Sequence, residues 1–122
     1  MKLSALNDLM NGRLSPAAFS TQIKNEVSYF ARSIKNNEMN LPIKVTDQIH
    51  WVITKGEVLA VLQLFIENKL SGDTLEYAIH CIEKSETTSY SEEIGDTLPL
   101  LLVAGTTTKN RIRRIITLLK GL

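Results

Sequence analysis

The sequence predicts an all-α protein, a compact bundle of about five to seven helices forming a single helical domain over residues 1–122. Three observations support this prediction. Apolar residues recur at helical spacings of three and four along most of the chain, serines and threonines stand where helix caps belong, and all six glycines are isolated at expected boundaries of elements. An apolar share of 43% in 122 residues also suffices for a buried core and argues against disorder.

The first third of the chain predicts two helices. Leu3, Leu6, Leu9 and Met10 indicate a short helix that ends at Asn11-Gly12, because glycine tolerates a left-handed C-terminal residue. Ser15 followed by Pro16 then supplies an N-cap and a first helical residue. Five apolar residues follow at spacings of four, four, three and four: Phe19, Ile23, Val27, Phe30 and Ile34. We therefore expect one continuous helix from about Pro16 to Lys35.

The stretch from residue 36 to residue 53 has the weakest pattern. Asparagines and Leu41-Pro42 predict a loop over residues 36–45. After it, two alternatives stay open. Thr46-Asp47 fits the start of a short helix that carries apolar residues to Ile53, whereas Ile49, Trp51 and Ile53 alternate as in a strand. A short β-like stretch near residues 43–53 is therefore allowed for in the predicted fold.

The second half predicts further helices. Residues 57–68 carry a wide apolar stripe suited to a central helix, and Ser71 caps the next helix, whose Leu75, Ala78, Ile79 and Ile82 face inward. Residues 87–91 form a polar connector, and the run from Ser91 indicates a helix start that Pro99 limits or kinks. The last predicted helix runs from a cap at Thr108 to Lys120, with Ile112, Ile115, Ile116 and Leu119 on one side.

Residues 6–23 resemble residues 62–79 at an offset of 56 positions. The match includes Arg13-Leu14-Ser15 against Lys69-Leu70-Ser71 and the apolar residues on either side. Both copies describe a helix, a tight turn that opens on a serine cap, and a second helix. A common helical hairpin explains this pattern more simply than a duplication, although both explanations stay open.

Charge is unevenly distributed along the chain, whose net charge is only +1. Residues 57–96 contain nine acids and two bases, a net charge of −7. Residues 1–56 carry +3, and residues 97–122 carry +5 with no acid. Such asymmetry bears on binding partners and association rates. It indicates a helical binding protein with an acidic face.

No pattern of residues indicates an enzyme, and we expect no catalytic residue, cofactor or metal. No Gly-rich phosphate loop is present, and neither His50 nor His80 has a metal ligand at a suitable spacing. Cys81 is the only cysteine, so an internal disulfide is excluded. His80 and Cys81 are neighbours that point about 100° apart on a helix, which is poor geometry for a nucleophile and its base. Apolar runs are too short to span a membrane, and we expect a cytoplasmic protein.

Two charged segments are candidate binding surfaces. The acidic middle supplies a partner-binding face, with tyrosines as possible anchors. Its candidate residues are Asp73, Glu76, Tyr77, Glu83, Glu86, Tyr90, Glu92, Glu93 and Asp96. Tyr77 fits a core position equally well. The alternative is a small nucleic-acid-binding regulator that uses Arg111, Arg113 and Arg114 of the basic last helix. Arg113 and Arg114 also fit pairing with the acidic middle of the same chain or a solvated face.

The phrase Leu62-x-x-Phe65-Ile66-x-x-Lys69-Leu70-Ser71, followed by Leu75, and its looser copy from Leu6 to Phe19 resemble small helical immunity proteins of bacterial toxin systems. Those of the colicin D type and of contact-dependent growth inhibition are the most similar, over about half the chain. The resemblance implies a protein that binds one cognate toxin domain, often a basic nuclease, and occludes its active site. It implies a monomer in a 1:1 complex, with no membrane partner.

Overall fold

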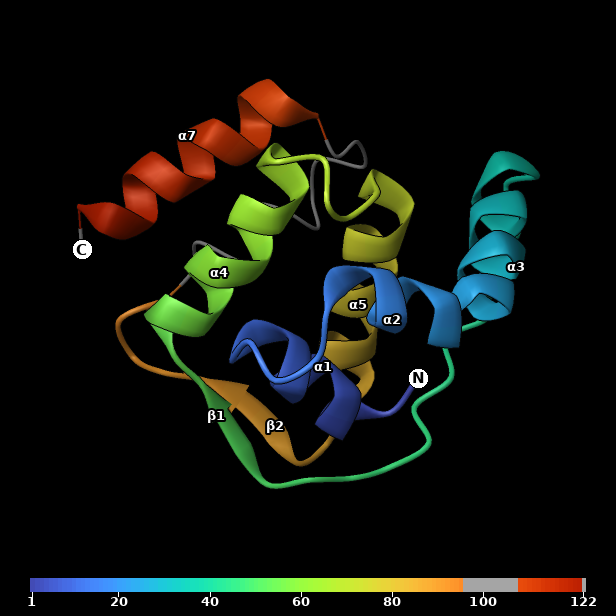
Figure 1. Cartoon of the computed structure of the whole chain (residues 1–122). Coiled ribbons are helices and arrows are strands. Elements are labelled where there is room, and N and C mark those ends of the chain that lie inside the picture. Colours follow the sequence, from blue (N-terminus) through green and yellow to red (C-terminus); the bar gives the residue numbers. More distant parts are fainter. Residues whose placement is uncertain (96–107, 122) are drawn as a thin grey trace.

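The computed structural model describes residues 1–95 and 108–121, and Figure 1 shows their arrangement. Within these residues well over half of the chain is helical, which confirms the predicted helical fold with a short β stretch. The elements are α1 (Leu3–Met10), α2 (Pro16–Gln22), α3 (Lys24–Lys35), β1 (Trp51–Ile53), α4 (Lys55–Ile66), α5 (Gly72–Lys84), β2 (Thr88–Tyr90) and α7 (Lys109–Lys120). No helix among the described residues is long and apolar enough to cross a membrane.

Helices α4 and α5 form the centre of the molecule. Helix α1 packs against both of them, α7 lies along α4, and α3 lies along α5 at the opposite edge (Figure 1). The apolar stripe predicted for the last helix is buried in the α4–α7 contact, with Ile112 and Leu119 fully covered. The caps predicted at Ser15, Ser71 and Thr108 are confirmed, because each side-chain oxygen accepts a backbone amide of its helix.

The two matching hairpins share one turn geometry. Gly12 and Asn68, which are 56 positions apart, both adopt left-handed conformations, with φ of 75° and 62°. The backbone amides of the next residues form equivalent hydrogen bonds. Arg13 N donates to Asp8 O at 2.8 Å, and Lys69 N donates to Leu64 O at 2.9 Å. Helix α3 ends in the same way at Asn37, where φ is 54°. The common helix-end motif therefore accounts for the turns without a duplication.

The predicted single helix from Pro16 to Lys35 is wrong, because it is broken at Ile23. This residue has φ −111° and ψ 12°, so α2 and α3 run in different directions. The break lets α2 pack on α1 and α3 pack on α5, with both Phe19 and Phe30 fully buried. Ile34, predicted on the apolar face, is 37% exposed at the far end of α3.

The segment of residues 36–50 has no regular secondary structure and crosses the surface as a strap. The predicted loop over residues 36–45 is confirmed, but Asp47 does not begin a helix of its own. Its carboxylate instead accepts the backbone amide of Leu3 (2.5 Å) and the hydroxyl of Ser4 (2.6 Å). A residue more than forty positions away therefore caps α1, whose own N-cap residue, Lys2, forms no side-chain cap.

The strand alternative is correct for residues 51–53. Strand β1 pairs in parallel with β2, and Trp51 lies opposite Thr88. Residues 87–91, predicted as a polar connector, therefore contain a strand. The helix predicted to start after Ser91 is not present up to Gly95, where residues 92–95 form a turn. Pro99 lies outside the described residues.

We predict that Gly12→Ala lowers the free energy of unfolding by about 1 kcal/mol. No atom lies within 4 Å of the added Cβ, so the cost comes from the left-handed backbone alone. Urea denaturation followed by circular dichroism measures the change. Gly121→Ala is the control, because Gly121 has φ −83° and the substitution is expected to be nearly neutral. Equal losses in both variants would contradict the explanation.

We predict that Asp47→Ala destabilises the fold by about 1–2 kcal/mol at neutral pH, because α1 loses its cap. Burial raises the pKa of Asp47, but hydrogen bonds from Ser4 and Leu3 outweigh it, and the net pKa lies below its ordinary value. A lowered pKa gives stability that is present at neutral pH and lost as the carboxylate protonates. The difference from wild type should therefore shrink below about pH 4. Unfolding curves across pH measure it, with Thr46→Ala as the neutral control.

Candidate partner-binding face

Helix α5 presents one polar stripe to solvent. Asp73, Glu76, His80 and Glu83 recur at spacings of three, four and three, which places them on one face of the helix. Most of the remaining circumference of α5 is buried. Asp73 and Glu83 are exposed, and Glu76 and His80 are partly buried at the edges of neighbouring elements. Burial of the other faces therefore determines where these carboxylates lie.

The electrostatics of this stripe favour a cationic partner. Burial, and then the neighbouring charge of Asp73, raise the pKa of Glu76. Burial also lowers the pKa of His80, against the opposing effect of Glu83, and its ring lies 5.3 Å from that of Phe30. His80 is therefore neutral at pH 7 and leaves the stripe negative. Among the described residues, none of the three acids forms a salt bridge.

Tyr90 extends the stripe at its C-terminal end. It lies at the end of β2, and its hydroxyl donates to Glu83 Oε1 at 3.4 Å. Burial, together with the charge of Glu83, raises the pKa of Tyr90, so the phenol stays protonated. Tyr90 is partly buried against the core and has a carboxylate neighbour at the surface. We refer to Asp73, Glu76, His80, Glu83 and Tyr90 as the acidic stripe.

Of the other predicted acids, Glu86, Glu92 and Glu93 lie in the segments that follow α5. Glu86 follows the end of α5 and borders a hollow of about 400 Å³ with Lys44 and Lys84. Glu92 and Glu93 lie in the turn after β2, and the Glu93 carboxylate is 3.7 Å from Lys55 Nζ at the start of α4. Asp96 lies outside the described residues. The structure thus places three of the predicted acids on one face of α5 and three others in the segments after it.

Tyr77 is not an exposed anchor, and the core alternative is correct. Its side chain is fully buried, and its ring packs edge-on against Phe30 at 5.3 Å. The hydroxyl donates to Glu26 Oε2 (2.7 Å) and accepts the amide of Lys44 (3.3 Å). The sequence itself indicates a buried position for Tyr77, because it precedes the buried Cys81 by four residues and so lies on the same face of the helix. By the same reasoning, His80 lies four residues after Glu76 and three before Glu83, so the sequence could have identified it as part of the stripe.

The basic face of α7 is separate from the acidic stripe. Arg113 and Arg114 are exposed, and neither forms a salt bridge with an acid in the described ranges. Arg113 donates instead to Asn110 Oδ1 at 3.3 Å. Helix α4 lies between α7 and α5 (Figure 1). The pairing considered between these arginines and the acidic middle is therefore not found in the part of the chain that the structure describes.

The described residues offer little for catalysis. No group of three or more His, Cys, Asp or Glu side chains within residues 1–95 and 108–121 could hold a metal ion. Burial raises the pKa of Cys81 to about 11, so its thiol is protonated at neutral pH.

Comparison with known proteins found no matching family model, no matching curated protein and no matching solved structure. The argument for function therefore depends on the geometry of this chain. Its most specific feature is the acidic stripe, in which three carboxylates and a tyrosine converge from α5 and β2.

We predict that Tyr77→Phe lowers the free energy of unfolding by about 1–2 kcal/mol without changing partner binding. The ring keeps its packing, while Glu26 and the amide of Lys44 lose their shared hydroxyl. Thermal and urea denaturation measure stability, and a pull-down measures binding. Tyr90→Phe is the matched control for stability alone, because its longer hydrogen bond to Glu83 lies at the surface. A loss of partner binding in stable, folded Tyr77→Phe would contradict the core role.

Proposed function

We propose that this protein is an immunity protein that binds a cognate toxin domain in the cytoplasm through the acidic stripe and covers its active site. The resemblance of the two hairpins to small helical immunity proteins supports the class of protein. The stripe supports the location of the interface and the positive charge of the partner. A nuclease fits this role, because it must attract phosphates with cationic side chains.

The observation that carries the proposal is a difference in charge between α5 and α2, the helix in the same place of the first hairpin. In the matching first hairpin, the positions equivalent to Asp73 and Glu76 are Ala17 and Ser20. The turn and the serine cap are the same in both hairpins. The hairpin therefore folds without acids at these positions. Asp73 in the first turn of α5 also suits the helix dipole, whereas Glu76 lies beyond the first turn, and partner binding accounts for its charge.

The partly buried Glu76 suits the capture of a cation. Its raised pKa shows that the carboxylate is held near a like charge and away from water. A lysine or arginine of the partner would offset the repulsion from Asp73 and compensate the carboxylate for lost water by a charged hydrogen bond. Glu83 lies about two turns further along α5, and Tyr90 of β2 lies beside it, so that the tyrosine adds a phenol next to the charge. Electrostatic steering by the stripe then favours fast association.

The test is affinity capture of the tagged protein from its native host, comparing wild type with Glu76→Lys/Glu83→Lys. We expect a basic protein bound to wild type, and a dissociation constant at least about tenfold higher for the variant with the purified partner. The matched control is Glu38→Lys/Glu67→Lys, which changes the net charge equally at exposed acids outside the stripe. Circular dichroism checks that each variant folds.

Protection against the toxin provides the second measurement. Cells that express the captured toxin domain should survive with wild type or the control, and die with the stripe variant. If the stripe variant binds and protects as well as the control does, the proposed interface is refuted. A partner that carries enzyme activity unaffected by the complex would refute occlusion of an active site.

A second candidate function, a nucleic-acid-binding regulator, is favoured by the exposure of Arg113 and Arg114 on α7. Phosphate contacts by these residues would make binding strongly dependent on salt. Capture of nuclease-sensitive nucleic acid without a protein partner, abolished by Arg113→Gln/Arg114→Gln, would establish this function. The same result would refute the immunity proposal.

A further inference from the structure

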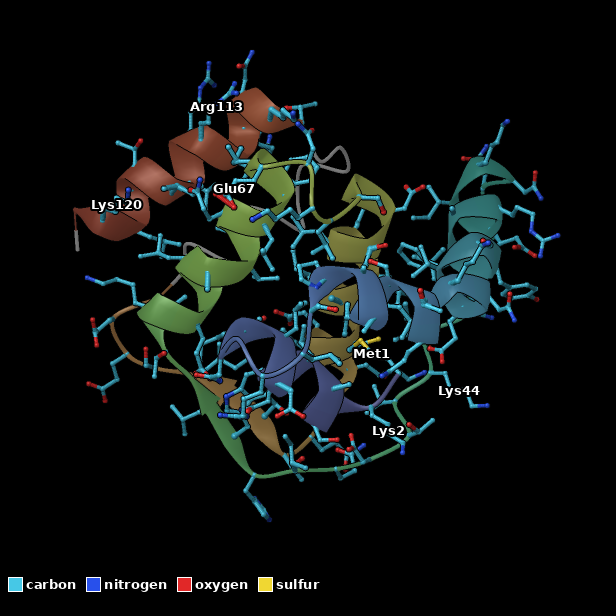
Figure 2. All side chains as sticks on the ribbon, in the orientation of Figure 1. Met1, Lys2, Lys44, Glu67, Arg113 and Lys120 are labelled. Carbon is cyan, nitrogen blue, oxygen red and sulfur yellow. The ribbon has the colours of Figure 1, made fainter. Side chains whose placement is uncertain are left out.

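The exposed face of α7 carries two cations at a defined spacing. Arg113, Thr117 and Lys120 follow one another at spacings of four and three, so all three share one side of the helix. All three are exposed, and Figure 2 shows Arg113 near the start of α7 and Lys120 near its end. Burial of the opposite, isoleucine-rich side against α4 leaves this face unpartnered in the described structure.

The acidic stripe repeats this spacing with the opposite charge. Glu76, His80 and Glu83 also follow one another at spacings of four and three. At a rise of about 1.5 Å per residue, the two charged ends are about 10.5 Å apart on each helix. The middle residue is uncharged in both, since His80 is held neutral by its surroundings. The two faces are therefore complementary in sign and in spacing.

A single chain cannot bring these faces together. Helix α4 separates α7 from α5, and no salt bridge joins the two helices in the described residues (Figure 1). We propose that the basic face of α7 docks on the acidic stripe of a second copy of this chain. In a parallel arrangement, which keeps the shared order of spacings, Arg113 faces Glu76. Lys120 then faces Glu83, and Thr117 lies opposite His80.

An apolar contact accompanies these charges. Leu118 is 54% exposed beside the basic face and adds apolar area to it. With Arg113, Arg114 and Thr117 it lines a shallow, open depression on the surface of α7. A surface that contacted only phosphates would gain nothing from this leucine. The mixture of charge and apolar area therefore favours a protein on this face over a nucleic acid.

The association is weak and depends on salt. Two turns of helix bury far less area than the roughly 1,600 Å² of a standard stable interface, and exposed ion pairs contribute little each. A partner with a more strongly basic cleft would displace the second copy from the acidic stripe. Self-association would then regulate access to that stripe and still leave a 1:1 complex. This consequence rests on the proposed function, whereas the self-association itself does not.

The experiment is sedimentation equilibrium of the purified chain at about 0.02 M and about 0.5 M salt. We expect the mass to exceed the 13.7 kDa of one chain at low salt, to rise with concentration, and to return to 13.7 kDa at high salt. Glu76→Lys/Glu83→Lys and Arg113→Glu/Lys120→Glu should each be monomeric at low salt. Mixing these two variants should restore association, because each supplies the face that the other lacks.

Control variants place the contact on these faces. Glu38→Lys should associate as wild type does, because Glu38 lies after α3 and away from both faces, and Leu118→Ser should raise the dissociation constant severalfold. A wild type that is monomeric at low salt overturns the proposal. So does a mixture of the two charge-reversed variants that stays monomeric, or an Arg113→Glu/Lys120→Glu variant that associates unchanged.

The outcome is distinguishable from failure of the proposed function. Self-association is measured on the chain alone, and toxin binding is measured on the captured partner. If duplex DNA binds α7 at low salt and the chain alone is monomeric, the face belongs to the nucleic-acid alternative and the second copy is excluded. If the chain associates but no toxin is captured, only the regulatory consequence is lost.

Discussion

Burial of α5 on most of its circumference is the constraint on which the rest of the structure depends. Helix α3 covers one side through Phe30, while α1, α4 and β2 contact others. Leu75 and Tyr77 lose all exposure as a result. A helix enclosed in this way can present polar residues along one line only, and that line is the acidic stripe. Core packing and the position of the acidic stripe therefore follow from one arrangement.

Hydrogen bonds from polar side chains hold the strap of residues 36–50, which apolar contacts alone do not fix. The strap of residues 36–50 has no backbone ladder, so its position depends on bonds from distant residues. The hydroxyl of Tyr77 holds the amide of Lys44, and Lys84 at the end of α5 donates to the carbonyl of Ile43 at 3.0 Å. Asp47 then caps α1. Helix α5 thus fixes a strap that in turn stabilises the start of the chain.

Features with a local cause could be predicted from the sequence, and features with a distant cause could not. The caps at Ser15, Ser71 and Thr108 depend on amides three residues away, so they were predictable. The break at Ile23 and the capping by Asp47 depend on packing across the fold. For the site, charge predicted the carboxylates of α5, but the separation of Glu93 from them depends on the turn after β2.

The net charge of +1 does not argue against an acidic interface, because the charges are separated in space. The acids of α5 and the bases of α7 lie on different sides of α4 (Figure 1). At physiological salt, fields are screened over about 8 Å, so an approaching partner senses the nearest face and little of the total. A cationic cleft is therefore attracted at α5 while α7 attracts anions. One small chain with almost no net charge can in this way carry two electrostatically distinct surfaces.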